Sequence, residues 1–138
     1  MTQILNLPLI AMDVATSNDA DWRMSFAVTD VTDAPVTLVG LSFLLRVWRE
    51  SGGHEILFVS LPGEITVSGA SSNILNVTIL ATRMLRLEIG EWPFEIIATA
   101  EGATMEFVTG TLSHGADGGS IITSISATQR AVGGFAAA

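Results

Sequence analysis

The sequence contains no cysteine and no lysine, and charged residues of either sign are scarce. Without cysteine the chain can form no disulfide, carry out no thiol catalysis and hold no cysteine-ligated zinc or iron–sulfur centre. Charged residues make up 14% of the chain, and 14 acidic residues against six arginines give a net charge of −8. No basic cluster is present, so we expect neither nucleic acid nor an anionic membrane surface as a partner.

Two further features are missing: a hydrophobic run of about 18 residues, and an N-terminal basic segment followed by an apolar stretch. We therefore expect no transmembrane helix and no signal peptide. The length of 138 residues corresponds to one domain, which can fold on its own core without disulfides or metals. A surface low in charge loses little hydration on contact, which favours packing against neighbouring proteins. The alternative is the threonine- and serine-rich surface of an ordinary β protein.

Alternation of apolar and polar residues with a period of two is the dominant pattern, clearest in residues 22–29. Further strands are expected at residues 3–15, 42–50, 55–61, 64–68, 73–81, 92–101 and 103–113, with Pro8 indicating an edge strand in the first. Thr82 is expected to cap one helical turn. Short links predict mainly antiparallel hairpins. We therefore predict an all-β fold, an antiparallel immunoglobulin-like β-sandwich of seven to eight strands with one short helical turn and an extended C-terminal arm.

The core of such a sandwich must form without the disulfide that joins its two sheets in antibody domains. We expect large aromatic side chains to fill it. The predicted core aromatic residues are Trp22, Phe26, Phe43, Phe58, Trp92, Phe94 and Phe107.

The last part of the chain differs in composition, so we divide it into a β-sandwich domain at residues 1–114 and a Gly/Ala-rich C-terminal arm at residues 115–138. Within the arm, residues 121–127 again alternate. Two interpretations remain open: the arm folds back on its own domain, or it docks on a neighbouring subunit by adding a strand. The candidate interface residues are Trp48, Arg49, Ile121, Ile122, Ile125 and Phe135.

Residues with catalytic or metal-binding chemistry are few. His54 and His114 lie beside glycines in expected turns and are interpreted as solvated polar residues. Asp19 and Asp21 are interpreted as turn residues rather than metal ligands. No phosphate-binding, dinucleotide-binding or nucleophile-elbow motif is present. We therefore predict no catalytic residue, no cofactor and no metal site, and a protein that is not an enzyme. An enzyme would need a histidine within hydrogen-bond reach of a serine or carboxylate in a cleft.

Three short elements carry a family resemblance. Leu38-Val39-Gly40 precedes the strand with Arg46, Gly90-Glu91-Trp92-Pro93-Phe94-Glu95 opens a late strand, and Val108-Thr109-Gly110 lies in the last one. Over residues 10–115 the chain resembles the small immunoglobulin-like domain of tailed-phage and prophage virion proteins, typified by the N-terminal domain of upper baseplate proteins. In the second element this chain has Trp and Phe where the family has Tyr.

The resemblance implies a phage virion structural protein, a tail, baseplate or appendage adaptor that acts through protein–protein contacts. Its implied partners are other virion proteins and copies of itself, in an oligomeric particle, and its implied location is the virion. One alternative is a capsid decoration or head-spike protein on the same fold. Another is a carbohydrate-binding or adhesin module with an exposed aromatic platform around Trp48. Deletion of residues 116–138 is expected to leave the sandwich folded and to weaken assembly.

Overall fold

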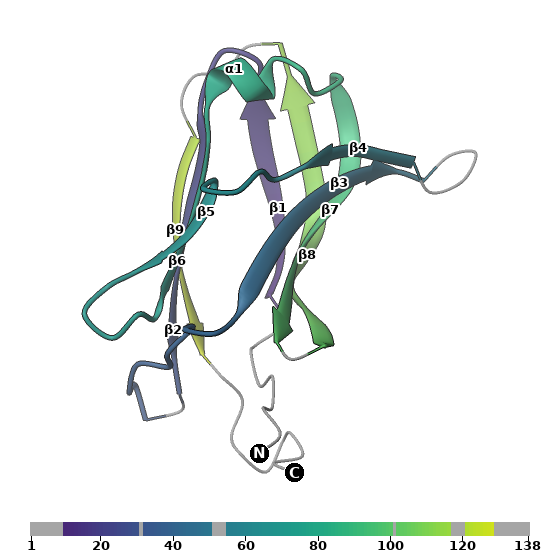
Figure 1. The fold of residues 1–138 in the computed structure, drawn as a ribbon. Coiled ribbons are helices and arrows are strands. Elements are labelled where there is room, and N and C mark those ends of the chain that lie inside the picture. Colours follow the sequence, from purple (N-terminus) through teal and green to yellow (C-terminus); the bar gives the residue numbers. More distant parts are fainter. Residues whose placement is uncertain (1–9, 31, 51–54, 101, 117–120, 129–138) are drawn as a thin grey trace.

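The computed structural model describes residues 10–30, 32–50, 55–100 and 102–116, and the backbone of residues 121–128. Two β-sheets face each other, and a short helix, α1 (Ala81–Met84), lies at one end of the sandwich (Figure 1). The expected hairpin loop at 51–54, which contains His54, lies outside the described residues, as do residues 3–9 of the first predicted strand.

The larger sheet has five strands in the order β1-β8-β7-β3-β4. Their bounds are Ile10–Ser17 for β1, Ala103–Gly115 for β8, Gly90–Ala100 for β7, Ser42–Arg49 for β3 and Glu55–Val59 for β4. β1 is an edge strand, as predicted for this part of the chain, and it runs parallel to β8. The two strands lie so close that a Cβ atom on Gly110 of β8 would come within 1.5 Å of the Met12 carbonyl oxygen. Glycine is therefore required at position 110.

The smaller sheet has four strands in the order β5-β6-β2-β9. Their bounds are Ile65–Ser68 for β5, Ile74–Ile79 for β6, Trp22–Thr29 for β2 and Ile121–Thr128 for β9. β9 pairs with β2 in parallel along its whole length.

The arrangement of strands is that of the immunoglobulin fold. In that fold strands A, B, E and D form one sheet and strands C, F and G the other, with C′ beside C in the variable type. Here β2, β6 and β5 take the places of B, E and D, and β8, β7, β3 and β4 those of G, F, C and C′. Antiparallel pairings dominate, and the parallel ones involve β1 and β9. The predicted all-β immunoglobulin-like sandwich is therefore confirmed.

Aromatic rings fill the space between the sheets, as the sequence predicted. Trp22 of β2 meets Phe94 of β7 edge-on, with ring centroids 5.7 Å apart, and Phe26 meets Phe107 at 5.5 Å. Five of the predicted aromatic side chains are buried, and Phe43 and Trp92 are partly buried against the same core. Antibody domains join strands B and F with a disulfide, and the Trp22–Phe94 pair spans the equivalent strands.

One prediction needs correction. The helical turn is not capped by Thr82: its N-cap position is Leu80, which makes no side-chain cap, and the Ala81 N–H donates to Asp21 Oδ1 at 2.8 Å. A loop 60 residues earlier in the chain thus satisfies the first amide of α1. Part of the C-terminal arm pairs with its own domain, which is one of the two interpretations that remained open. β8 continues to Gly115, and residues 121–128 form the ninth strand because the free edge of β2 can pair with them.

Candidate interaction surface

Arg83 of α1 joins the helix to the segment that crosses from one sheet to the other. Its Nε donates to Glu64 Oε2 at 2.9 Å and its Nη2 to the Val59 carbonyl oxygen at 2.7 Å, and the guanidinium lies 4.4 Å from the centre of the Phe58 ring. Partial burial raises the pKa of Glu64, but hydrogen bonds from Arg83 and the Leu61 N–H outweigh it and leave the pKa below its usual value. The contact between α1 and the crossing segment is therefore a charge-neutral pair.

Large apolar side chains stand exposed on the segments that Arg83 joins. The exposed fractions are 38% for Val59, 52% for Leu61, 53% for Leu80 and 65% for Leu85. We call these four residues the α1 surface. The nearby charges of Arg83 and Glu64 already neutralise each other. A partner could cover the α1 surface without leaving an unpaired charge in a dry interface. The sequence pattern did not indicate this surface, because leucines next to a helical turn have the pattern of core residues.

Trp48, a predicted interface anchor, lies near the end of β3 and is half-buried. Its indole Nε1 donates to Glu50 Oε1 at 2.8 Å. Every aromatic side chain among the described residues is buried or half-buried. The described part of the chain therefore presents no exposed aromatic platform of the kind that a carbohydrate-binding module needs.

Arg49, the second predicted anchor, is committed to contacts within the chain. Its guanidinium pairs with Glu88, its Nε lies 3.9 Å from Glu55 Oε1, and the group sits 5.1 Å from the centre of the Trp92 ring. The Trp92 indole N–H in turn donates to the Glu88 carbonyl oxygen at 2.8 Å. Arg49 thus ties the end of β3 to the start of β4 and to the link between α1 and β7. Trp48 and Arg49 are therefore not part of the α1 surface.

Another ion pair lies on the outer face of the larger sheet. Arg46 of β3 and Glu95 of β7 are opposite each other in the antiparallel register, and Arg46 Nε donates to Glu95 Oε2 at 2.8 Å. Only 7% of Glu95 is exposed although it faces away from the core. The resemblance included Arg46 and the element that ends at Glu95, but it did not indicate that these two residues, 49 positions apart, form a pair.

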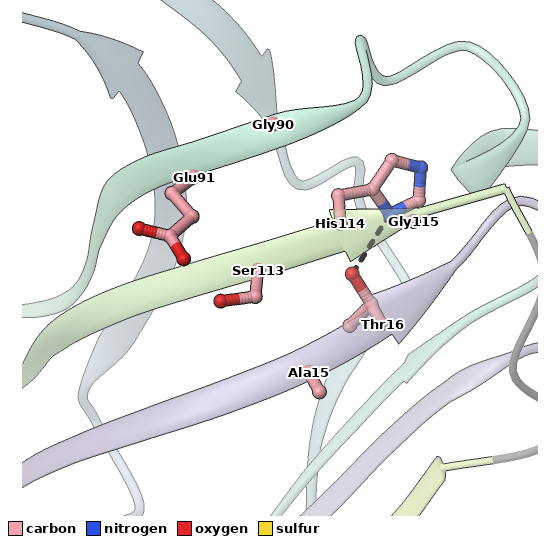
Figure 2. A pocket seen from close by; sticks show the side chains of 7 residues that line it. All are labelled: Ala15, Thr16, Gly90, Glu91, Ser113, His114 and Gly115. Atoms are coloured by element: carbon pink, nitrogen blue, oxygen red, sulfur yellow. Dashed lines mark hydrogen bonds between the residues drawn. The ribbon is translucent and has the colours of Figure 1, made fainter.

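A shallow hollow of about 400 Å³ lies where β1, β8 and β7 meet near α1 (Figure 2). His114 is buried at its side, which corrects the prediction of a solvated turn residue. β8 pairs with β1 on one side and with β7 on the other, and both pairings continue beyond Ser113. His114 therefore lies in a strand and not in a turn. The His114 Nδ1 lies 2.8 Å from Thr16 Oγ1, and its Nε2 lies 2.6 Å from Asn18 Oδ1. Burial lowers the pKa of His114, since it disfavours the imidazolium; a backbone hydrogen bond with Met84 opposes this in part.

The hollow does not bring together an acid–base pair of the kind an enzyme would need. Both ring nitrogens of His114 contact neutral groups, a hydroxyl and an amide. Ser113 is the neighbour of His114 in the strand, so its side chain points to the opposite face, where Figure 2 also shows Glu91. His114 therefore has a structural role in joining β8 to β1 and the turn after it.

The aspartates act through local hydrogen bonds. Asp30 Oδ1 accepts from the Thr32 hydroxyl at 2.6 Å and from the Thr32 and Ala34 amides at 2.8 and 3.0 Å, and these bonds lower the Asp30 pKa. Asp21 accepts from the Ala81 amide and pairs with Arg23. Within the described residues no three histidine or acidic side chains form a metal-binding group. In the same part of the chain no helix has the length and apolar character needed to cross a membrane.

The remaining interface candidates belong to the C-terminal part of the chain. Ile121 and Ile125 are aligned with Trp22 and Phe26 of β2, and Ile122 with Arg23. Trp22 and Phe26 are fully buried, and Arg23 is exposed. The backbone register therefore aligns Ile121 and Ile125 with buried positions of β2, and Ile122 with an exposed position. Phe135 lies outside the described residues.

Comparison with protein-family models finds no match, and comparison with curated proteins finds none either. Among solved structures, the chain is similar to the titin M3 domain, with 10% identity over 81% of this chain and 94% of that one and a TM-score of 0.36. It is also similar to murine CRIg, with 12% identity over 77% of this chain and 92% of that one and a TM-score of 0.35. Similarities at this level say nothing about function.

Proposed function

We propose that this chain is a non-enzymatic structural protein of a tailed-phage virion, a tail, baseplate or appendage adaptor that works through contacts with other virion proteins and with its own copies. The observation that carries the protein-contact role is the α1 surface, four exposed apolar side chains around a neutral ion pair. The virion role rests on the resemblance of the three short elements to virion domains, together with the low charge of the chain.

The α1 surface suits a protein partner better than a small molecule or a nucleic acid. Its four apolar side chains are exposed beside the Arg83–Glu64 pair, and exposed apolar clusters of this kind mark protein contacts. The net charge of −8 opposes binding to phosphate backbones. The proposal therefore includes no nucleic acid, membrane, metal or cofactor.

Mass spectrometry of purified particles from the organism that encodes the chain tests the virion role. We expect its peptides in particles at a stoichiometric level, and separation of heads from tails distinguishes a tail or baseplate adaptor from a capsid decoration protein. Particles that lack the chain would overturn the proposal.

A matched pair of variants tests the contact surface. Leu85→Ser should reduce incorporation into particles without changing the melting temperature, because Leu85 is 65% exposed. Val39→Ser is the control: Val39 is 66% exposed and precedes β3 at the opposite end of the sandwich. Equal incorporation of the two variants would show that the α1 surface is not the contact.

A further inference from the structure

The four strands at the sheet edges differ in how they are protected against pairing with other chains. Soluble proteins protect such edges with short strands, charged side chains, prolines or bulges. β5 has only four residues. β4 has five residues, begins with the exposed Glu55 and is offset by an irregularity in its register with β3. β1 carries the exposed Asp13 in its middle.

β9 has none of these protections. It is eight residues long and pairs with β2 without a register shift. Its sequence, Ile-Ile-Thr-Ser-Ile-Ser-Ala-Thr, contains no charged residue and no proline, and most of its residues are β-branched, which favours a strand. Among the described strands β9 has β2 as its single neighbour, so the backbone groups along its other side face no described strand.

We propose that the free edge of β9 pairs with β9 of a second copy, antiparallel about a two-fold axis, so that two four-stranded sheets become one continuous sheet. This inference deepens the proposed function, because it names a copy of the chain as one partner and the edge that it uses.

The absence of charge on β9 favours a second copy of the chain as the partner at this edge. When identical strands pair antiparallel about a two-fold axis, residue i faces residue j of the copy and residue j faces residue i. A strand that carries charge of one sign therefore brings like charges together across the pair, which is destabilising. β9 is free of charge although the chain as a whole carries −8. The opposite edge of the same sheet is the short β5, which limits further addition. The assembly therefore closes as a pair and does not grow into a fibre.

The test introduces like charges at Ser124 and Ser126. Both are aligned with Ser25 and Ala27 of β2, positions outside the buried row, so charged side chains there should leave the fold intact. We expect the unmodified chain to have twice its 14.5 kDa mass by light scattering coupled to size exclusion. The S124K/S126K variant should dimerise roughly tenfold or more weakly. An equimolar mixture of S124K/S126K with S124E/S126E should restore the pair.

Ser68→Lys is the matched control, because Ser68 is exposed on β5 at the other edge of the same sheet. It should leave the dimer unchanged. A monomeric unmodified chain from micromolar to millimolar concentration, dimers that tolerate the lysine pair, or failure of the oppositely charged mixture to associate would overturn the inference.

Amide hydrogen exchange on the unmodified chain keeps the test independent of the variants. Exchange of β9 amides should slow as protein concentration rises. If the exchange rates of the β9 amides do not depend on protein concentration, no second copy covers this edge. That result would overturn the inference. A chain found in particles but monomeric would contradict β9 pairing alone, while a dimer absent from particles would contradict the virion role alone.

Discussion

Trp22 and Phe94 hold β2 and β7 together across the core by packing alone. A disulfide between such strands would also restrict the unfolded chain, whereas a ring pair stabilises only the folded state. Both side chains are fully buried, so their contribution depends on close packing with the rest of the core. Substitutions at either ring therefore act on the folded state directly.

We expect Trp22→Leu and Phe94→Leu each to lower the free energy of unfolding by about 1–3 kcal/mol. Because the rings meet edge-on at 5.7 Å, the double variant should lose less than the sum of the single losses, by about 0.5–1.5 kcal/mol. Urea unfolding of the four proteins measures this coupling. Val39→Ala, an exposed position, should change the free energy by less than about 0.5 kcal/mol. Additive losses would contradict a direct ring–ring interaction.

His114 should make stability depend on pH. Burial holds its folded-state pKa below the unfolded value of about 6.5. Above pH 6.5 the ring is neutral in both states and its contribution to stability is complete. As the pH falls through about 6.5 the unfolded state takes up a proton and the folded state does not, so stability is lost until the folded pKa is reached.

The melting temperature should therefore fall between about pH 7.5 and pH 5.5, and His114→Gln should show a smaller fall. The pKa values of Asp21, Asp30 and Glu64 are lowered, so these carboxylates take up protons only at more acidic pH. They therefore do not affect the comparison between pH 7.5 and pH 5.5. Thermal melts of both proteins across this range give the result. Identical pH profiles would mean that His114 titrates alike in the folded and unfolded states.

At the scale of the elements, β9 changes what a truncation should do. The sequence favoured a sandwich that stays folded without residues 116–138. In the structure, removal of β9 turns β2 into an edge strand and uncovers one side of the row that contains Trp22 and Phe26.

We expect deletion of residues 116–138 to lower the free energy of unfolding by about 2 kcal/mol or more, since a full ladder of backbone hydrogen bonds is lost. Deletion of residues 129–138 is the control, because it retains β9, and it should leave the melting temperature unchanged. Circular dichroism melts compare the two. If both truncated chains melt at the same temperature, β9 does not contribute to the fold.

Strand positions were predictable where one face of a strand is buried. The alternation of Trp22, Met24, Phe26 and Val28 gave β2, and all four are buried. Parallel pairings were not predictable, because nothing local in β1 or β9 specifies a partner far away in the sequence. The same holds for the Asp21 cap of α1 and the burial of His114, which depend on contacts 60 and 98 residues apart. The α1 surface was missed because exposure is a property of the assembled fold.

At the scale of the whole molecule, the two proposed contacts occupy different places. The α1 surface lies on α1, at one end of the sandwich, and on the segment that links β4 to β5, whereas β9 runs along the flank (Figure 1). A pair of copies joined through β9 therefore leaves both α1 surfaces free for other proteins. This arrangement is what an adaptor with more than one kind of neighbour requires.

Net charge sets the salt dependence of self-association. Two copies that each carry −8 repel each other, while the β9 edge itself holds no charge. The screening length falls from about 30 Å at 0.01 M to about 8 Å at 0.15 M salt. Sedimentation equilibrium should therefore show stronger dimerisation at the higher salt concentration. Weaker dimerisation would point to ion pairs between the copies and away from an uncharged edge.

The parallel pairings of β1 and β9 also determine how the domain bears force. β1 begins and β9 ends at the same end of the sandwich, opposite α1 (Figure 1). A pull that separates Ile10 from Thr128 therefore loads the first hydrogen bonds of β1 with β8 and the last ones of β9 with β2, one after another. Strands loaded in this way peel apart in sequence and do not share the load. Tension between Ile10 and Thr128 would therefore separate the β1–β8 and β9–β2 pairings one residue pair at a time.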